Sequence, residues 1–378
     1  MTSNTSRADD KAKEEPKCPS GHFGEEEDKR ECISPNIWNL FVICAAALAL
    51  QPSLVSGASL EETAKMDSAE VLKYYGYPAE THRVQTIDGY ILTLHRIPNK
   101  KSKRPPVLIM HGILDSSFTW LLTGPQTALG FKLFDSGYDV WLGNFRGNVY
   151  SQSHNWLSTD QDEYWDFSWD EMGKRDLPAM VDYVLHRTGR PKLFHIGHSM
   201  GTTTFFVLTS SMPGYNKKFV AHFSLSPVGY WGNSASFFWK ILAPVEMALS
   251  TIYNVVAAHI PAGTSVKAFN HYTQLMKSGR FCSYDSHDMK KNYLRYGTAR
   301  PPEYNVSAIT VPVQFYYAAN DAVSVPVDVI KLYTQLRNPI GLHLVQDTLF
   351  NHIDFTIDPK AYKLIYRKMI KMMNSLSL

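Results

Sequence analysis

Residues 193–201 read Leu-Phe-His-Ile-Gly-His-Ser-Met-Gly, an apolar run that passes directly into the pattern Gly-x-Ser-x-Gly around Ser199. A serine at the apex of a sharp turn between a strand and a helix sits in strained backbone, so the residues two positions away must be small. Residues 202–212 have the composition of a buried helix that stops at Pro213-Gly214. The order strand, turn, helix predicts that Ser199 is a nucleophile on a nucleophile elbow. The alternative is an ordinary serine in a turn between two glycines.

The composition of the whole chain is that of a large folded protein. Its 378 residues are 44% hydrophobic and 13% aromatic, which suits one large domain with a smaller insertion. The formal net charge is +3, and because residues 1–36 carry six Lys and Arg against nine Asp and Glu, the remaining residues carry +6. A charge of this size, spread along the chain, does not indicate a nucleic-acid-binding surface.

The four cysteines exclude an internal disulfide in the body of the chain, because only Cys282 follows residue 58. No cysteine and histidine have the spacing of zinc ligands, so the 14 histidines are interpreted singly as surface or packed side chains. We therefore expect no metal site.

The first 58 residues differ in character from the rest. Residues 1–36 are charged and nearly free of large apolar side chains, which predicts a disordered acidic extension. Residues 37–50 form an uncharged apolar run of 14 residues, shorter than the roughly 20 that a spanning helix needs. This run predicts a signal peptide over 37–58 with cleavage after Ala58. Because signal peptides rarely follow a long acidic segment, an uncleaved type II membrane anchor stays open. In both cases the body leaves the cytosol.

The body begins with an antiparallel hairpin over residues 84–97, where two β-rich runs flank Asp88-Gly89. Strands and helices then alternate through the first part of the body, 59–227, which predicts an α/β fold with a mostly parallel sheet. The expected elements are strands at 107–110, 138–142, 193–196 and 218–225 and helices at 126–136, 177–188 and 202–212. The last two helices begin at Asp176-Leu177-Pro178 and at the elbow, and Ser168-x-x-Glu171 is a capping box.

Residues 228–302 interrupt the alternation. Within them, residues 237–260 are nearly all apolar, which predicts a helical cap over the sheet. The alternation resumes in the second part of the body, residues 303–378. We expect a strand at 311–319, a helix at 326–335, a short strand at 342–345 and a final helix that begins at Asp358-Pro359.

A serine hydroxyl needs a base to take its proton and an acid to hold that base in one tautomer. In a parallel sheet both follow later strands, in the order Ser, Asp or Glu, His. Asp321 directly follows the strand at 311–319, and His352 follows the last strand by a short loop. No other pair meets both conditions, so we predict the triad Ser199, Asp321 and His352.

The oxygen that becomes negative during attack on a carbonyl needs backbone donors. These are expected to be the amides of Met200, after the nucleophile, and of Ile113, beside His111-Gly112. The place of His111 on this loop favours a structural hydrogen bond. His195 and His198 are interpreted as packing around the elbow.

From about residue 66 onward the sequence resembles the acid lipase family of α/β-hydrolases, which includes gastric lipase, lysosomal acid lipase and many insect gut lipases. The shared motifs are Gly76-Tyr77-Pro78, Thr86-Ile87-Asp88-Gly89-Tyr90-Ile91-Leu92, His111-Gly112, Gly137-Tyr138-Asp139-Val140-Trp141-Leu142-Gly143-Asn144 with Arg146-Gly147, Gly197-His198-Ser199-Met200-Gly201-Thr202-Thr203, Pro261-Ala262-Gly263-Thr264-Ser265 and Asn351-His352-Ile353-Asp354-Phe355. The resemblance implies hydrolysis of carboxylic esters of neutral lipids at a lipid–water interface, by a monomer without a cofactor. It implies that the family's nucleophile corresponds to Ser199, its acid to Asp321 and its base to His352. The family's oxyanion amides correspond to those of Ile113 and Met200.

The sequence departs from the family pattern at two places. The family usually has glutamine where this chain has Met200, a change that leaves the amide in place. The family's cap and lid are more than twice as long as the segment after Ser226-Pro227 here, so we expect a shortened cap. A soluble carboxylesterase with an open site, or a weakly active or non-catalytic lipid-binding protein, therefore stays open. The resemblance and the glycosylation sequon at Asn305 indicate a secreted or lysosomal protein.

Overall fold

The computed structural model describes residues 62–234, 256 and 258–377, all within the unit formed by residues 52–378. The predicted extension (1–36), the predicted signal segment (37–58) and most of the apolar stretch 237–260 lie outside the described residues.

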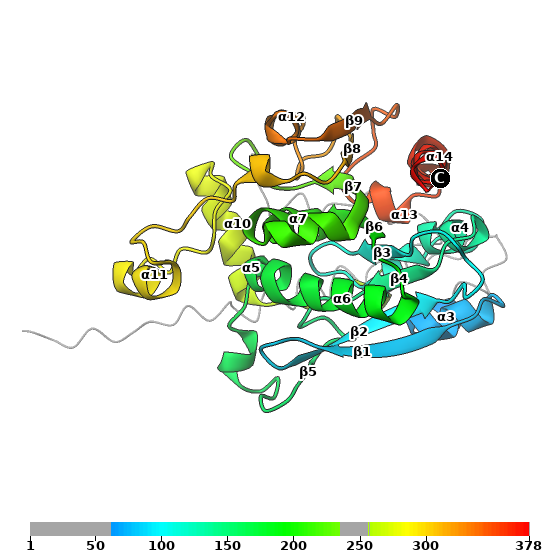
Figure 1. Ribbon diagram of the computed structural model, residues 1–378, viewed down its shortest axis with the longest axis horizontal. Coiled ribbons are helices and arrows are strands. Elements are labelled where there is room, and N and C mark those ends of the chain that lie inside the picture. The colour runs from blue at the N-terminus through cyan, green and yellow to red at the C-terminus, as the bar shows by residue number, and fades with distance from the viewer. Residues whose placement is uncertain (1–61, 235–255, 257, 378) are drawn as a thin grey trace, which may run out of the picture. The chain divides into compact units, whose positions relative to one another are not determined.

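The described residues form one nine-stranded sheet in the order β1-β2-β4-β3-β6-β7-β8-β9, with β5 paired to β2 beside this path (Figure 1). The strands β1 and β2 are antiparallel, β2 is antiparallel to β4 and β5, and all other neighbours are parallel. This confirms the predicted hairpin and the predicted mostly parallel sheet. The strands are β1 Glu80–Gln85, β2 Tyr90–Ile97, β3 Val107–Met110, β4 Val140–Gly143, β5 Ser153–His154, β6 Leu193–Ser199, β7 Phe219–Pro227, β8 Val313–Tyr317 and β9 Pro339–Leu344.

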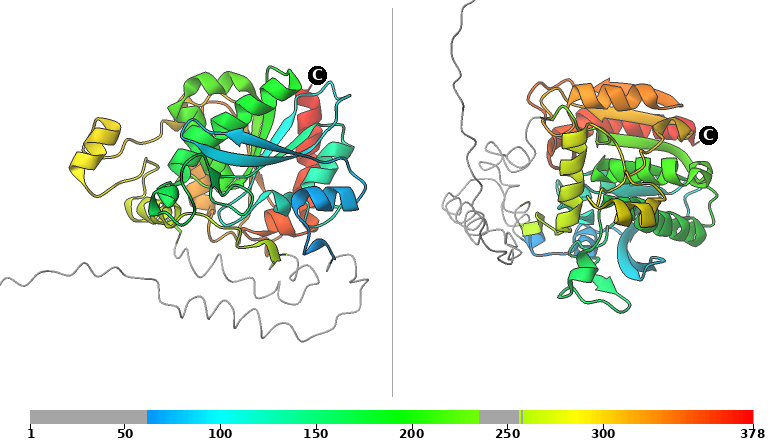
Figure 2. Two further views of the ribbon diagram at one scale, coloured as in Figure 1. Left: turned by 90° about the horizontal axis from the view of Figure 1, so that it is seen from below. Right: turned by 90° about the vertical axis from the view of Figure 1, so that its left-hand side faces the viewer.

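Helices pack against both faces of the sheet (Figure 2). Side chains of the central strand β3 alternate between the two faces: Leu108 and Met110 join one core cluster, Val107 and Ile109 the other. The first cluster includes residues of α6, α7, α10 and α12, and the second includes residues of α3, α4 and α14. The α-helices are α3 Ser68–Tyr74, α4 Leu129–Asp135, α5 Trp169–Glu171, α6 Leu177–Thr188, α7 Met200–Ser211, α10 Val266–Ser278, α11 Met289–Tyr296, α12 Pro326–Gln335, α13 Asp354–Ile357 and α14 Arg367–Leu376. Short 3₁₀ helices are η1 Ser117–Trp120, η2 Asp162–Trp165, η4 Pro213–Lys218 and η6 Val306–Ala308.

The helix before the elbow strand begins earlier than predicted. Its capping box at Ser168 is confirmed, because the Ser168 amide donates to Glu171 (2.7 Å) and the Asp170 amide donates to the Ser168 hydroxyl (3.2 Å). The helix then continues through the π-helical turn η3 (Met172–Asp176) into α6. The prediction of a new helix at Asp176 was therefore wrong. In the π turn the Leu177 amide bonds to the Met172 carbonyl, one residue further back than in an α-helix, so the missing amide of Pro178 does not end the helix.

Most other predicted elements are present with shifted ends, as expected where helix termini fray. The helix predicted at 126–136 is shorter, the last strand begins at Pro339, and the final helix passes through a π turn, η7 (Tyr362–Tyr366), before α14.

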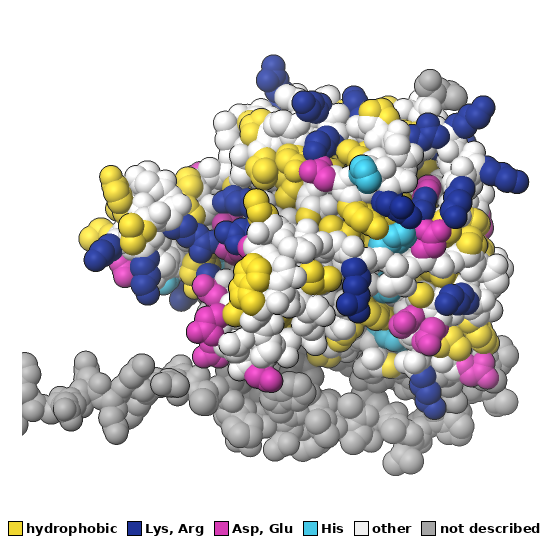
Figure 3. Space-filling model, turned by 60° about the horizontal axis from the view of Figure 1, so that its bottom comes forward, with side chains coloured by type: hydrophobic (Ala, Val, Ile, Leu, Met, Phe, Trp, Pro, Cys, Tyr) yellow, Lys and Arg dark blue, Asp and Glu magenta, His cyan; other side chains and the backbone are white. Residues whose placement is uncertain are grey.

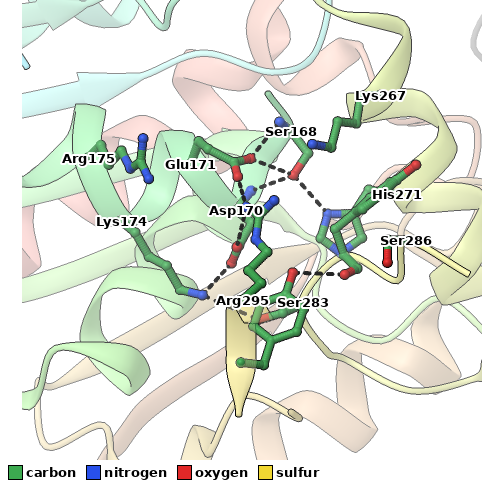
Figure 4. Close-up of polar contacts among 12 residues, drawn as sticks. Ser168, Asp170, Glu171, Lys174, Arg175, Lys267, His271, Ser283, Ser286 and Arg295 are labelled. Atoms are coloured by element: carbon green, nitrogen blue, oxygen red, sulfur yellow. Dashed lines mark hydrogen bonds and ion pairs between the residues drawn. The ribbon is translucent and has the colours of Figure 1, made fainter. Parts of the chain in front are cut away.

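A buried polar cluster joins α5 to the segment that carries α10 and α11 (Figure 4). Asp170 forms an ion pair with Lys174 (2.7 Å) and accepts a hydrogen bond from the Tyr304 hydroxyl, while Arg295 of α11 pairs with Glu171. His271 of α10 stacks on Trp169, with ring centroids 3.6 Å apart. Burial alone would raise the pKa of the Asp170 carboxyl, but Lys174 and Tyr304 hold that pKa below its ordinary value.

Replacing Asp170 with alanine should lower the free energy of unfolding by about 3 kcal/mol at pH 7, because Lys174 and Tyr304 lose a buried partner. A carboxyl with a depressed folded-state pKa stabilises the protein above its unfolded pKa and loses this effect on acidification, so the difference should shrink below about pH 4. Urea denaturation at several pH values measures both. The control is Asp182→Ala at the exposed pair with Lys218, which should cost under about 1 kcal/mol. Equal losses in the two variants would contradict the role of the cluster.

Candidate active site

Ser199 lies where β6 meets α7, with φ 50° and ψ −116°, a conformation that few non-glycine residues adopt. Two glycines allow the turn to close. A side chain at Gly197 would place its Cβ 2.6 Å from the Gly201 carbonyl carbon, and one at Gly201 would overlap the Met110 carbonyl oxygen of β3. The predicted sequence strand, turn, helix is thus confirmed, and its strained residue is the predicted nucleophile.

The three predicted catalytic side chains meet at this turn. His352 Nε2 lies 2.8 Å from Ser199 Oγ, and His352 Nδ1 lies 3.0 Å and 3.1 Å from the two carboxylate oxygens of Asp321. Asp321 follows β8 and His352 follows β9, so both loops leave the same edge of the sheet as the elbow. All three residues are less than 10% exposed. The arrangement can take a proton from Ser199 and hold the resulting imidazolium against a carboxylate.

Asp321 is held as a carboxylate. Burial alone would raise its pKa, but His352 and the surrounding donors hold the pKa of the Asp321 carboxyl below its ordinary value. Two of these donors are the backbone amides of Val323 and Ser324, at 2.9 Å and 2.8 Å from Oδ1. An ionised Asp321 accepts from His352 Nδ1–H and so leaves Nε2 unprotonated toward Ser199.

Sequence reasoning missed Ser226, the penultimate residue of β7. Its hydroxyl lies 2.5 Å from Asp321 Oδ2 and 2.6 Å from His352 Nδ1. The sequence did contain a signal for a place in the site. Ser226 directly follows the strand predicted at 218–225, and this strand pairs with the elbow strand in the parallel sheet.

The two other histidines at the site are neutral. His198 donates from Nε2 to the backbone carbonyl of His352 (2.8 Å), and burial lowers the pKa of His198 to about 3. It packs beside the elbow as predicted, and its hydrogen bond to His352 is an addition that the sequence did not reveal. His111 donates from Nδ1 to the Gly112 carbonyl (2.7 Å) and accepts from the Phe145 amide (3.2 Å), while burial lowers its pKa to about 4. The predicted structural role of His111 is confirmed.

The predicted oxyanion donors belong to the residue after Ser199 and to the loop that follows β3. Met200 is the first residue of α7, and Ser199 makes no side-chain cap on this helix because its hydroxyl faces His352. Ile113 follows Gly112, whose missing Cβ would lie only 3.3 Å from Ser199 Cβ. The loop is braced by a backbone hydrogen bond of 2.7 Å from the Ala262 amide to the Leu114 carbonyl. The first amides of a helix are natural donors to a negative oxygen.

The remaining predicted features concern glycosylation, metals and membranes. Asn305 and Ser307 of the sequon are both exposed. Among residues 62–234, 256 and 258–377, no cluster of three or more histidine, cysteine or acidic side chains is arranged to hold a metal ion. Over the same ranges no helix has the length and apolar character needed to cross a bilayer. On the face seen in Figure 3, Lys and Arg are interspersed with acidic and apolar side chains.

Two family models match the chain: a partial α/β-hydrolase lipase region over residues 68–124 and the α/β hydrolase fold over residues 105–243. Lipase 1 of Drosophila melanogaster is 36% identical, with 83% of this chain and 81% of that protein aligned. Gastric triacylglycerol lipase of Bos taurus is 36% identical, over 82% of this chain and 91% of that protein. Lysosomal acid lipase/cholesteryl ester hydrolase of Homo sapiens is 32% identical, over 88% and 97%.

Among solved structures, naproxen esterase from Bacillus subtilis superimposes with a TM-score of 0.52 at 14% identity, over 85% of this chain and all of that one. At this identity the likeness shows the fold alone.

Asp115, on the loop that carries the Ile113 amide, should make stability depend on pH. Burial raises the pKa of the Asp115 carboxyl to about 7. A raised folded-state pKa favours the folded protein at low pH and costs stability as the pH rises toward 7. Asp115→Asn should therefore raise the melting temperature by a few degrees at pH 7.5 and hardly change it at pH 4. Scanning calorimetry at both pH values tests this, with exposed Asp160→Asn as the control. A stabilisation independent of pH would contradict it.

Proposed function

The chain belongs to the acid lipase family of α/β-hydrolases and is a carboxylic ester hydrolase, and we propose that it cleaves esters of neutral lipids with Ser199, His352 and Asp321. The observation that carries this proposal is the line of contacts from Ser199 Oγ to His352 Nε2 (2.8 Å) and from His352 Nδ1 to Asp321 (3.0 Å). The kind of substrate is supported by the names of the relatives, a triacylglycerol lipase and a cholesteryl ester hydrolase.

In the first half of the proposed reaction, Ser199 Oγ attacks the ester carbonyl carbon while its proton passes to His352 Nε2. Asp321 stabilises the imidazolium through Nδ1–H. The carbonyl oxygen becomes negative and is held by the amides of Ile113 and Met200, each worth about 3 to 4 kcal/mol in reactions of this type. When the tetrahedral intermediate collapses, the ester C–O bond breaks and the alcohol leaves with the proton from His352.

In the second half, water attacks the acyl-enzyme. His352 takes one proton from the water, the second tetrahedral intermediate collapses, and the fatty acid leaves as the proton returns to Ser199 Oγ. All of these steps use side chains and amides of the chain itself.

We further propose a secretory route, with the signal peptide at 37–58 removed after Ala58 and a glycan on Asn305. The gastric and lysosomal names of the relatives support this route. The exposure of Asn305 and Ser307 supports modification of the sequon.

Ser199→Ala should lower ester hydrolysis by at least about 10⁴-fold while leaving the fold intact, because it removes the hydroxyl that faces His352 Nε2 and would form the acyl-enzyme. Release of fatty acid from emulsified triolein, and of nitrophenol from a short soluble ester, measures the loss. The control is Ser211→Ala at the exposed end of α7, which should keep full activity. Equal background hydrolysis by the wild type and Ser199→Ala would leave only lipid binding.

The same assay separates a lipase from a carboxylesterase. The wild type should hydrolyse emulsified triolein, and its rate should rise once the triolein concentration passes its solubility limit. A wild type active on the soluble ester alone would contradict the neutral-lipid assignment and favour the carboxylesterase.

A further inference from the structure

The end of β7 contains a bulge that turns Ser226 toward the Asp321–His352 pair. In the pairing with β6, His198 lies opposite Leu225 and Ser199 lies opposite Pro227, so Ser226 is an extra residue on its strand. Its φ of 53° lies in the left-handed region, which few non-glycine residues adopt. Bulges near active sites often re-aim one side chain. Here the re-aimed side chain is fully buried, at 0% exposure.

The Ser226 hydroxyl lies between the carboxylate and the imidazole. It is 2.5 Å from Asp321 Oδ2 and 2.6 Å from His352 Nδ1, whereas His352 Nδ1 and Asp321 Oδ2 are 3.0 Å apart. An ionised carboxylate only accepts hydrogen bonds, so the single Ser226 proton points to Asp321. The remaining lone pairs of Ser226 Oγ then face the proton on His352 Nδ1.

We propose that Ser226 is a positioning residue for His352. The Ser226 hydroxyl accepts a hydrogen bond from His352 Nδ1–H and donates one to Asp321 Oδ2. It fixes the plane of the imidazole, so that Nε2 points at Ser199 Oγ. It also withdraws negative charge from the carboxylate that faces the imidazolium. The inference rests on the proposed function, because it requires His352 to be the base.

This role predicts an effect on pH dependence. Without the hydroxyl, His352 Nδ1–H bonds only to the Asp321 carboxylate. That carboxylate has lost a hydrogen-bond donor, so more of its negative charge faces the imidazolium and stabilises it. On the acidic limb of the pH profile, a variant without the hydroxyl should therefore lose activity at a higher pH than the wild type does.

Besides Asp321, the described residues place three titratable groups close to His352 or to its neighbours. His198 of β6 lies beside it, with ring centroids 5.0 Å apart, His111 from the loop after β3 interacts with His198, and Asp354 of α13 accepts from the Asn351 amide next to His352 in the chain. Burial keeps His198 and His111 neutral, with pKa values of about 3 and about 4. Burial raises the pKa of Asp354 to about 6, within the range of the measurement. An Asp354→Asn background therefore removes its contribution.

The test compares the pH profile of kcat/KM on a soluble ester for the wild type, Ser226→Ala and Ser226→Gly, each also in the Asp354→Asn background. Glycine tolerates a φ of 53°, so Ser226→Gly removes the hydroxyl without backbone strain. The matched control is Ser224→Ala, a buried serine on the same strand that bonds to His222 (2.7 Å). Circular dichroism over the same pH range checks the fold.

Both Ser226 variants should lower kcat about tenfold with little change in KM, the effect of losing one hydrogen bond to a charged group. The acidic limb should move upward by about half a pH unit or more, and Ser224→Ala should keep the wild-type profile. An acidic limb that stays in place or moves downward in both folded variants would overturn the role of Ser226. Activity that survives Ser199→Ala would overturn the proposed function and this inference together, so the two failures are distinguishable.

Discussion

The backbone at Ser199 is the constraint on which the rest of the site depends. Its positive φ places Oγ above the end of the sheet. This turn brings the start of α7 so close to β3 that only glycine fits at position 201. The same turn leaves the Ser199 hydroxyl free of a capping role and turned toward His352.

The parallel sheet brings the other parts of the site to this point. The strands β3, β6, β7 and β8 are parallel neighbours, so the loop that carries Ile113, the elbow, Ser226 and Asp321 all lie at or just after carboxyl ends along one edge. The buried polar groups there are arranged around one ionised carboxylate. Asp321 receives amide, hydroxyl and imidazole donors, while His198 and His111 stay neutral because burial lowers their pKa values. A single fully satisfied charge costs far less to bury than several unpaired ones.

Much of this arrangement was predictable from the sequence. The glycines around Ser199, the strand before Asp321 and the loop before His352 depend on local patterns, and the structure brings these three side chains together. Ser226 was missed because its role depends on a bulge and a register shift, which arise from pairing between strands rather than from local sequence. The helix start at Asp176 was mispredicted for a similar reason: the π turn that accommodates Pro178 leaves no mark in residue periodicity. Of the shortened cap predicted at 228–302, residues 235–255 and 257 lie outside the described part of the chain, whereas α10 and α11 lie within the described part.

The central claim is that Ser199 is the nucleophile and that His352 activates it. Its most direct test is reaction of the folded wild-type protein with an active-site-directed phosphonate ester, followed by peptide mass spectrometry of the adduct. We predict a single adduct on Ser199, which His352→Ala should abolish without loss of fold. An adduct on another residue, or no adduct in a folded and active protein, would contradict the claim.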